Sequence, residues 1–136
     1  MIVDHNRYQE SSEERAMEKS ELKTFTTADE VREFRQGRVE LLNAGGVRVG
    51  RVTFEPGWRW NTSIGPLADT PTCDVRHFFY HLSGTLGVRM DDGTQFECRP
   101  GELAILPPGH DAWVVGDERV VVLELEGIRD PTRFGD

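Results

Sequence analysis

Four side chains that can bind transition metals lie in the middle of the chain. Cys73 precedes His77 by four residues, His81 follows His77 by four, and His110 comes directly after the turn sequence 107–109, Pro-Pro-Gly. Imidazole nitrogens and a cysteine sulfur suit zinc, iron, nickel or copper better than magnesium or calcium. The residue types indicate a transition-metal site; the alternative is that these side chains only pack in the core.

Alternation places two of these histidines on one face of a predicted strand. Val75, His77, Phe79 and His81 are separated by single residues, and every second side chain of a strand points to the same side. His81 lies further along the strand than His77. We therefore expect His81 to line the cavity or to orient a ligand rather than to bind the metal directly.

The elements that must position these residues are short strands joined by tight turns. The chain has 14 Gly and 7 Pro, and 18 of these 21 lie between Gly37 and Gly116. From Val39 onward the apolar residues alternate with a period of two, and Asp91-Asp92-Gly93-Thr94 is a strong hairpin signal. About nine strands at this spacing predict an all-β sandwich or barrel.

In the last strand, Val120–Glu126, polarity predicts which side chains point into the core. We expect Val121, Leu123 and Leu125 to point inward and Glu124 and Glu126 outward, since carboxylates are seldom buried.

The first 36 residues are predicted to form a polar arm. Ser11 and Glu14 could cap a short helix through about Lys19, and residues 27–30 form a better capping box that opens a helix at about 28–36. Gly37 would end this helix. Residues 37–127 then form the barrel and residues 128–136 a C-terminal tail.

Aromatic residues are candidates for the wall of a binding pocket. Trp58 and Trp60 alternate on a predicted strand face after Pro56-Gly57, and Trp113 follows His110 by three residues. Ligand pockets are lined mainly by apolar and aromatic groups. With His81, the predicted lining is Phe79, Trp58, Trp60, Tyr80 and Trp113; the alternative is burial in the core or an interface.

These residues and turns resemble the cupins. Gly101, five residues, Pro107 and then Gly109 fit the spacing of the second cupin motif, although His110 directly follows Gly109 and Ala112 occupies the usual histidine position. Counting back from Gly84, His77 stands at the glutamate position of the first motif and Cys73 at that of its second histidine, whereas Pro71 replaces its first. The segments PGWRWN, LSGTLGVRMDDGT and PPGHDAWVVGDE are similar to a bacterial cupin subgroup, and the resemblance covers about residues 39–127.

The resemblance implies a fold and a ligand set. The fold would be a cupin barrel, a double-stranded β-helix or jelly roll, and the metal ligands would be Cys73, His77 and His110. Zinc or iron is the expected metal, with nickel or manganese as alternatives. Cupin barrels often pair, so a homodimer is expected.

Two functions are consistent with the predicted fold and ligand set. The first is a metal-binding cupin that binds or acts on a small organic molecule in its cavity, with oxygenase, isomerase and lyase chemistry all left open. The second is a non-catalytic ligand-binding or sensor module, with or without a metal. Fold alone does not choose between them.

The composition of the chain argues against several classes of binding partner. The chain has 136 residues with 16 Lys and Arg against 24 Asp and Glu, a net charge of −8, which argues against a nucleic-acid partner. No apolar run approaches the roughly 20 residues that span a bilayer. The polar N-terminus lacks the features of a secretory signal, and two cysteines make no disulfide scaffold, so we expect a cytoplasmic protein.

Overall fold

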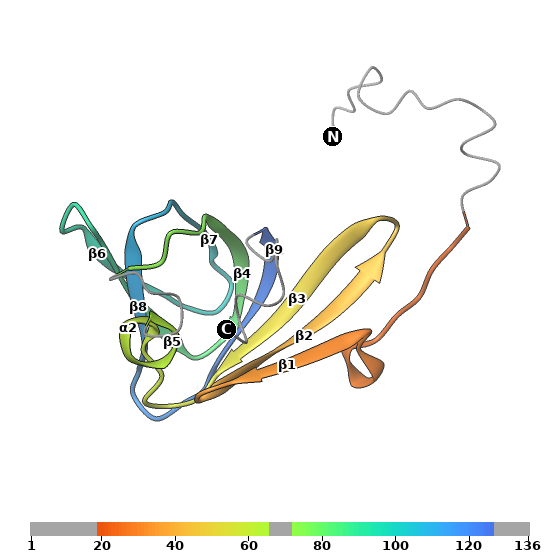
Figure 1. Cartoon of the computed structure of the whole chain (residues 1–136), viewed down its shortest axis with the longest axis horizontal. Helices are drawn as coiled ribbons and strands as arrows, with labels where there is room; N and C mark the ends of the chain where they lie inside the picture. The colour runs from red at the N-terminus through yellow and green to blue at the C-terminus, as the bar shows by residue number, and fades with distance from the viewer. Residues whose placement is uncertain (1–18, 66–71, 127–136) are drawn as a thin grey trace, which may run out of the picture.

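Antiparallel strands make up most of the structure. The computed structural model describes residues 19–65 and 72–126, and Figure 1 shows their arrangement. The strands are β1 (Glu30–Phe34), β2 (Gly37–Ala44), β3 (Val47–Phe54), β4 (His77–Ser83), β5 (Thr85–Met90), β6 (Gln95–Cys98), β7 (Leu103–Leu106), β8 (His110–Val115) and β9 (Val120–Glu126). Two short helical turns accompany them, η1 (Phe25–Thr27) and α2 (Trp60–Ser63).

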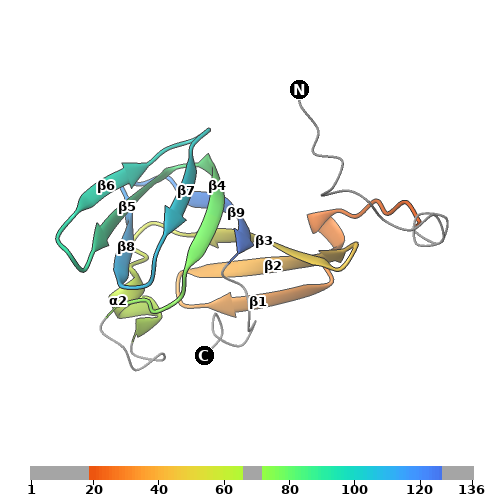
Figure 2. The ribbon, with the colours of Figure 1, turned by 90° about the horizontal axis from the view of Figure 1, so that it is seen from above.

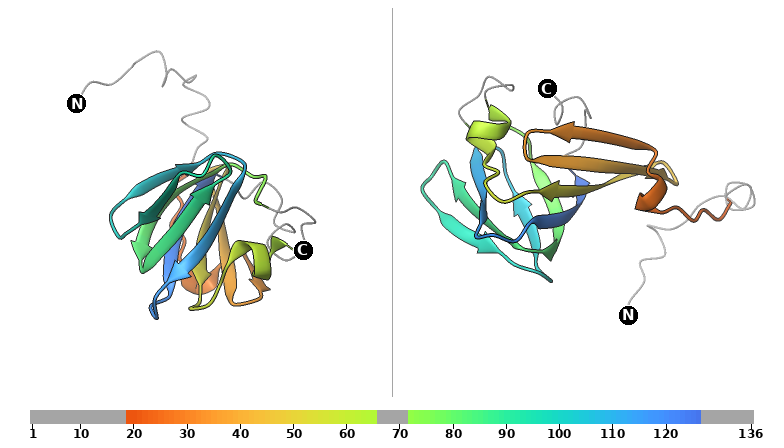
Figure 3. Two further views of the ribbon diagram at one scale, coloured as in Figure 1. Left: turned by 90° about the vertical axis from the view of Figure 1, so that its left-hand side faces the viewer. Right: turned by 90° about the horizontal axis from the view of Figure 1, so that it is seen from below.

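The strands form two sheets around one core. The larger sheet has the order β1-β2-β3-β9-β4-β7 and the smaller has the order β6-β5-β8. The smaller sheet faces β3, β9 and β4 across the core (Figure 3), while β1 and β2 extend from one side of this body (Figure 2). The core contains Val39, Leu41, Val52, Val88 and Val120, all at most 1% exposed. The predicted all-β jelly roll is confirmed.

The turn at residues 91–94 is formed as predicted. Gly93 has a φ of 91°, which costs a glycine little, and the Asp92 carboxylate accepts the N–H of Thr94 at 2.8 Å. The N–H of Met90 donates to the carbonyl of Thr94 at 2.8 Å. This closes the β5–β6 hairpin.

The predicted helix at 28–36 is wrong: this segment forms β1. The carboxylate of Asp29 accepts the backbone N–H of Asn43, and the N–H of Asp29 donates to the carbonyl of Leu41, so the expected capping residue instead docks against β2. Gly37 does not end a helix, because Phe34 pairs with Gly37 across a two-residue turn in which Gln36 has a φ of 62°. Pairing along the whole strand outweighs a local capping signal.

The other predicted helix, from Ser11 toward Lys19, falls almost entirely on residues 11–18, which lie outside the described residues, as does the tail 128–136. Within residues 19–65 and 72–126, neither helical segment has the length and apolarity needed to cross a membrane.

Candidate metal centre

The barrel encloses a largely apolar cavity between its two sheets. It is lined by aliphatic and aromatic side chains together with four groups that can ionise: Val52, Phe54, Trp58, Trp60, Ile64, Cys73, Val75, His77, Phe79, Leu86, Leu106, His110, Ala112, Val122 and Glu124. The ionisable groups are Cys73, His77, His110 and Glu124. Three of them were predicted as metal ligands, and the fourth was not.

Backbone hydrogen bonds hold Cys73 beside His110. The N–H of Cys73 donates to the carbonyl of His110 at 2.8 Å, and the N–H of Gly109 donates to the carbonyl of Cys73 at 2.7 Å. Gly109 has a φ of 91°, a conformation that residues with a Cβ rarely adopt. The turn 107–109 thus sets the first residue of β8 against Cys73, although the two are 37 positions apart.

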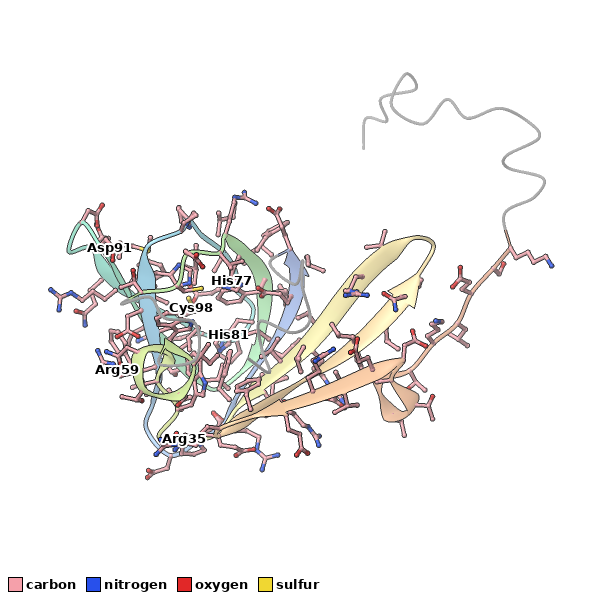
Figure 4. The ribbon with its side chains drawn as sticks, in the orientation of Figure 1. Arg35, Arg59, His77, His81, Asp91 and Cys98 are labelled. Carbon is pink, nitrogen blue, oxygen red and sulfur yellow. The ribbon has the colours of Figure 1, made fainter. Side chains whose placement is uncertain are left out.

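His77 opens β4 and lies within the barrel (Figure 4). It brings the third donor to the same place. Its Nε2 lies 3.4 Å from the Cys73 Sγ, and its ring meets the His110 ring edge-on with centroids 5.2 Å apart. One ligand atom from each of these three residues lies within 4.8 Å of the others. The structure thus brings together all three predicted ligands.

Each histidine has its other ring nitrogen occupied. The Nδ1–H of His110 donates to the carbonyl of Pro107 at 2.7 Å. The Nδ1–H of His77 donates to the carboxylate of Glu124. These bonds fix both rings and leave each Nε2 for a metal, which is the usual arrangement around histidine ligands.

The inward position of Glu124 corrects the predicted facing of the last strand. Val120, Val122 and Glu124 point into the barrel and are at most 3% exposed, whereas Leu125 is 44% exposed. The four consecutive apolar residues at 120–123 allow either the odd-numbered or the even-numbered side chains of the strand to point inward. Because carboxylates are rarely buried, the odd-numbered set was expected, and this expectation is wrong. What permits burial here is the His77 ring across the β4–β9 pairing.

Mutual contacts shift the pKa values of this cluster. Burial raises the pKa of the Cys73 thiol, but hydrogen bonds from His110 and His77 outweigh burial and lower the pKa to about 6. Burial lowers the pKa of His77, yet the Glu124 charge and the Cys73 sulfur raise it to about 10. Burial raises the pKa of Glu124, and His77 opposes this rise. Without a metal, the cluster is a thiolate held against a charged imidazole.

This geometry suits metal binding better than cysteine nucleophile chemistry. The contacts from Cys73 through His77 to Glu124 have the connectivity of an activated nucleophile, its base and an orienting carboxylate. Such a triad uses His110 only as a hydrogen-bond partner of the Cys73 sulfur, whereas a metal uses all three residues as ligands. Zinc–sulfur and zinc–nitrogen bonds of about 2.3 and 2.05 Å at a tetrahedral angle separate the two donor atoms by about 3.6 Å. The 3.4 Å between Sγ and Nε2 agrees with this value.

The predicted pocket residues divide into two groups. Phe79, Trp58 and Trp60 line the cavity. The two tryptophans reach it from a turn and from α2, not from a strand as predicted, because Pro56-Gly57 starts a tight turn in which the Trp58 N–H donates to the Glu55 carbonyl at 3.0 Å.

The remaining three lie outside the described cavity wall. His81 is fully buried and its Nε2 bonds the carbonyl of Gly84 at 2.6 Å, so it fixes a turn within the core. Tyr80 is on the outer face of β4 and 40% exposed. Trp113 covers Gly87 and lies under the guanidinium of Arg59, 5.0 Å from its ring centroid.

Comparison with known proteins identifies the fold. No family model matches the chain, and no curated protein matches it. A protein of unknown function from Acinetobacter sp. ADP1 is 13% identical with a TM-score of 0.51, over 74% of this chain and 97% of that one. A cupin-superfamily sugar phosphate isomerase from Silicibacter pomeroyi is 22% identical with a TM-score of 0.51, over 70% and 68%. A protein of unknown function from Rhizobium leguminosarum is 22% identical with a TM-score of 0.50, over 67% and 80%.

The chain has the cupin fold, and the resemblance drawn from its motifs is confirmed at that level. Its particular features within that fold are the Cys73, His77 and His110 cluster and the buried Glu124 behind it.

Proposed function

We infer that Cys73, His77 and His110 bind one divalent transition metal. The observation that carries this proposal is the convergence of three donor atoms within 4.8 Å, with the second nitrogen of each histidine tied elsewhere. Three protein ligands leave a coordination position for a small molecule, as in catalytic metal sites. A metal bound there would act as a Lewis acid toward an oxygen atom of that molecule.

The donor set favours zinc or iron. A thiolate with two imidazoles is a soft to borderline set that suits these ions, with nickel or manganese as alternatives. Glu124 supports this assignment because a carboxylate behind a histidine ligand holds the ring and makes its free nitrogen a better donor.

The proposed ligand or substrate is a small organic molecule in the cavity beside the metal. Both an enzyme and a non-catalytic ligand-binding or sensor module use such a site. Sugar phosphate isomerase, the activity named for one structural neighbour, is not carried over, because the described cavity wall contains no Lys or Arg to balance a phosphate.

Elemental analysis of untagged protein, purified without added metal, tests the metal site. We expect about one equivalent of zinc or iron per chain, lost in His77→Ala, His110→Ala and Cys73→Ser. Cys98→Ser is the matched control because Cys98 is also buried but does not line the cavity. Metal retained in Cys73→Ser would remove the cysteine from the site, and metal retained in His110→Ala would overturn the proposed ligand set.

We also propose a homodimer. Five apolar side chains on the outer face of the larger sheet are 40–60% exposed: Tyr80, Leu82, Leu103, Ile105 and Leu125. They lie on β4, β7 and β9, and β7 is the last strand of the larger sheet, so a free strand edge adjoins the apolar face. A second copy related by a twofold axis would cover both.

A further inference from the structure

The cavity wall limits which small molecules can bind beside the metal site. Among the described residues, eleven of the fifteen that line it are aliphatic or aromatic, and the other four are Cys73, His77, His110 and Glu124. No Ser, Thr, Asn, Gln, Tyr, Lys or Arg side chain is in that set. Away from these four residues, hydroxyl or phosphate groups entering the cavity would lose water without gaining partners, which costs free energy for each group.

The cavity is also small. Its volume is about 70 Å³, which is room for about five to seven waters when each needs on the order of 10–15 Å³. The space is therefore of the size of one ring or a short branched chain.

We propose that the ligand is a small, mainly apolar molecule with one anionic oxygen group, such as an aromatic monocarboxylate or a phenolate. The oxygen group would occupy the open metal position, and the apolar body would contact side chains such as Phe79 and Leu106. This inference rests on the proposed metal site and specifies what that site recognises. Sugar phosphates and other polyhydroxylated molecules are excluded as ligands.

Cobalt(II)-loaded protein allows a direct test, because cobalt substitutes for zinc and its visible spectrum reports the ligands. Addition of Co²⁺ to metal-free protein should give a sulfur-to-cobalt charge-transfer band that is absent in Cys73→Ser. Benzoate should then shift the cobalt d–d bands saturably. Acetate, which has the same carboxylate without the ring, should bind at least about tenfold more weakly, and glucose 6-phosphate should not bind.

The outcomes separate the two proposals. No charge-transfer band would overturn the metal site, and isothermal titration of metal-free protein would then test whether benzoate still binds more tightly than acetate. A normal charge-transfer band together with equal affinity for benzoate and acetate would overturn the proposal that the ligand is an apolar monoanion. Binding of glucose 6-phosphate would do the same. Neither result would contradict the metal site.

Discussion

Glu124 shows how a residue outside the ligand set can control the candidate site. Its carboxylate lies behind His77 and accepts the Nδ1–H, so when a metal displaces the Nε2 proton it would fix the tautomer in which Nε2 carries the lone pair. The described cavity wall has no Lys or Arg, so the cationic groups that act on the Glu124 carboxylate are the imidazoles of His77 and His110. Because Glu124 is outside the group of three ligand atoms and contacts His77, we expect it to act on a bound metal through His77.

Glu124→Gln is expected to weaken zinc binding about 10- to 100-fold, the usual cost of losing a partner behind a ligand. Competition with a chromophoric chelator measures the affinity. Glu126→Gln is the control, since Glu126 is on the same strand but pairs with Arg76 at 2.6 Å. Equal affinities for the two variants would show that Glu124 does not support the site.

Cys98 gives a prediction of pH dependence away from the site. Burial, with the nearby Glu102 charge, raises the pKa of the Cys98 thiol to about 11, from an ordinary value near 9. The folded state thus holds this proton more tightly than the unfolded state, so the contribution to stability is full below about pH 9 and is lost as the pH rises toward 11.

Urea unfolding under reducing conditions at pH 8 and pH 10.5 tests this linkage. The free energy of unfolding of the unsubstituted protein should fall more between these pH values than that of Cys98→Ala. Other groups that titrate are common to both proteins, so their effect cancels in the comparison. Parallel losses would mean that Cys98 ionises equally in the folded and unfolded states.

At the scale of elements, the turn before β8 positions the site. Gly109 has a φ of 91°, and a Cβ there would lie 2.5 Å from the Asp91 Oδ2. Its N–H also holds the Cys73 carbonyl. A side chain at 109 would therefore strain the turn that holds Cys73 beside His110.

Gly109→Ala is expected to destabilise the fold by about 1–3 kcal/mol through backbone strain and also to weaken metal binding. Gly101→Ala is a matched control: Gly101 has a φ of 89°, but a Cβ there meets nothing within 4 Å. Thermal unfolding should show losses in both variants, and metal titration should show a loss only in Gly109→Ala. If metal affinity is unchanged in both, the turn does not position the ligands.

Strands and turns were predictable from the sequence where local chemistry decides them. Alternation placed Val75, His77 and Phe79 on one face, and Gly93 identified a hairpin, because both signals depend on neighbours in the chain. The helix at 28–36 was wrong because the competing partner, β2, is not local. Local signals say little about such pairing.

The candidate site also contains residues that local signals predicted and one that they did not. Spacing around the turns identified Cys73, His77 and His110 as a group, and the structure brings them together. Glu124 was missed because its inward facing depends on a partner 47 residues away, across the β4–β9 register. A glutamate within an apolar strand was the one available signal, and solvent exposure is its commoner explanation.

At the scale of the whole molecule, a bound metal would join the two sheets. His77 is on β4 of the larger sheet and His110 is on β8 of the smaller one. An ion that binds only the folded state stabilises it by about 4 kcal/mol when its free concentration is a thousand times its dissociation constant.

Removal of metal with a chelator should therefore lower the thermal unfolding midpoint, and zinc should restore it. Cys73→Ser, which lacks a donor, should show little response to either treatment. A chelator effect of equal size in Cys73→Ser would place the stabilising metal elsewhere.

The exposed apolar face determines the expected assembly. In register, Tyr80 on β4 pairs with Leu103 on β7, and Ile105 extends the same face along β7. Exposed apolar surface next to a free strand edge favours pairing between copies, and lysine on an edge strand opposes it.

Light scattering should give about twice the 15.4 kDa mass of one chain at micromolar concentration. The Leu103→Lys, Ile105→Lys double variant should give the mass of one chain with its fold intact. Val31→Lys with Val47→Lys is the control, because both side chains are similarly exposed, at 52% and 57%, on β1 and β3. A single-chain mass for the unsubstituted protein, or a dimer that survives the β7 lysines, would rule out this face as the interface.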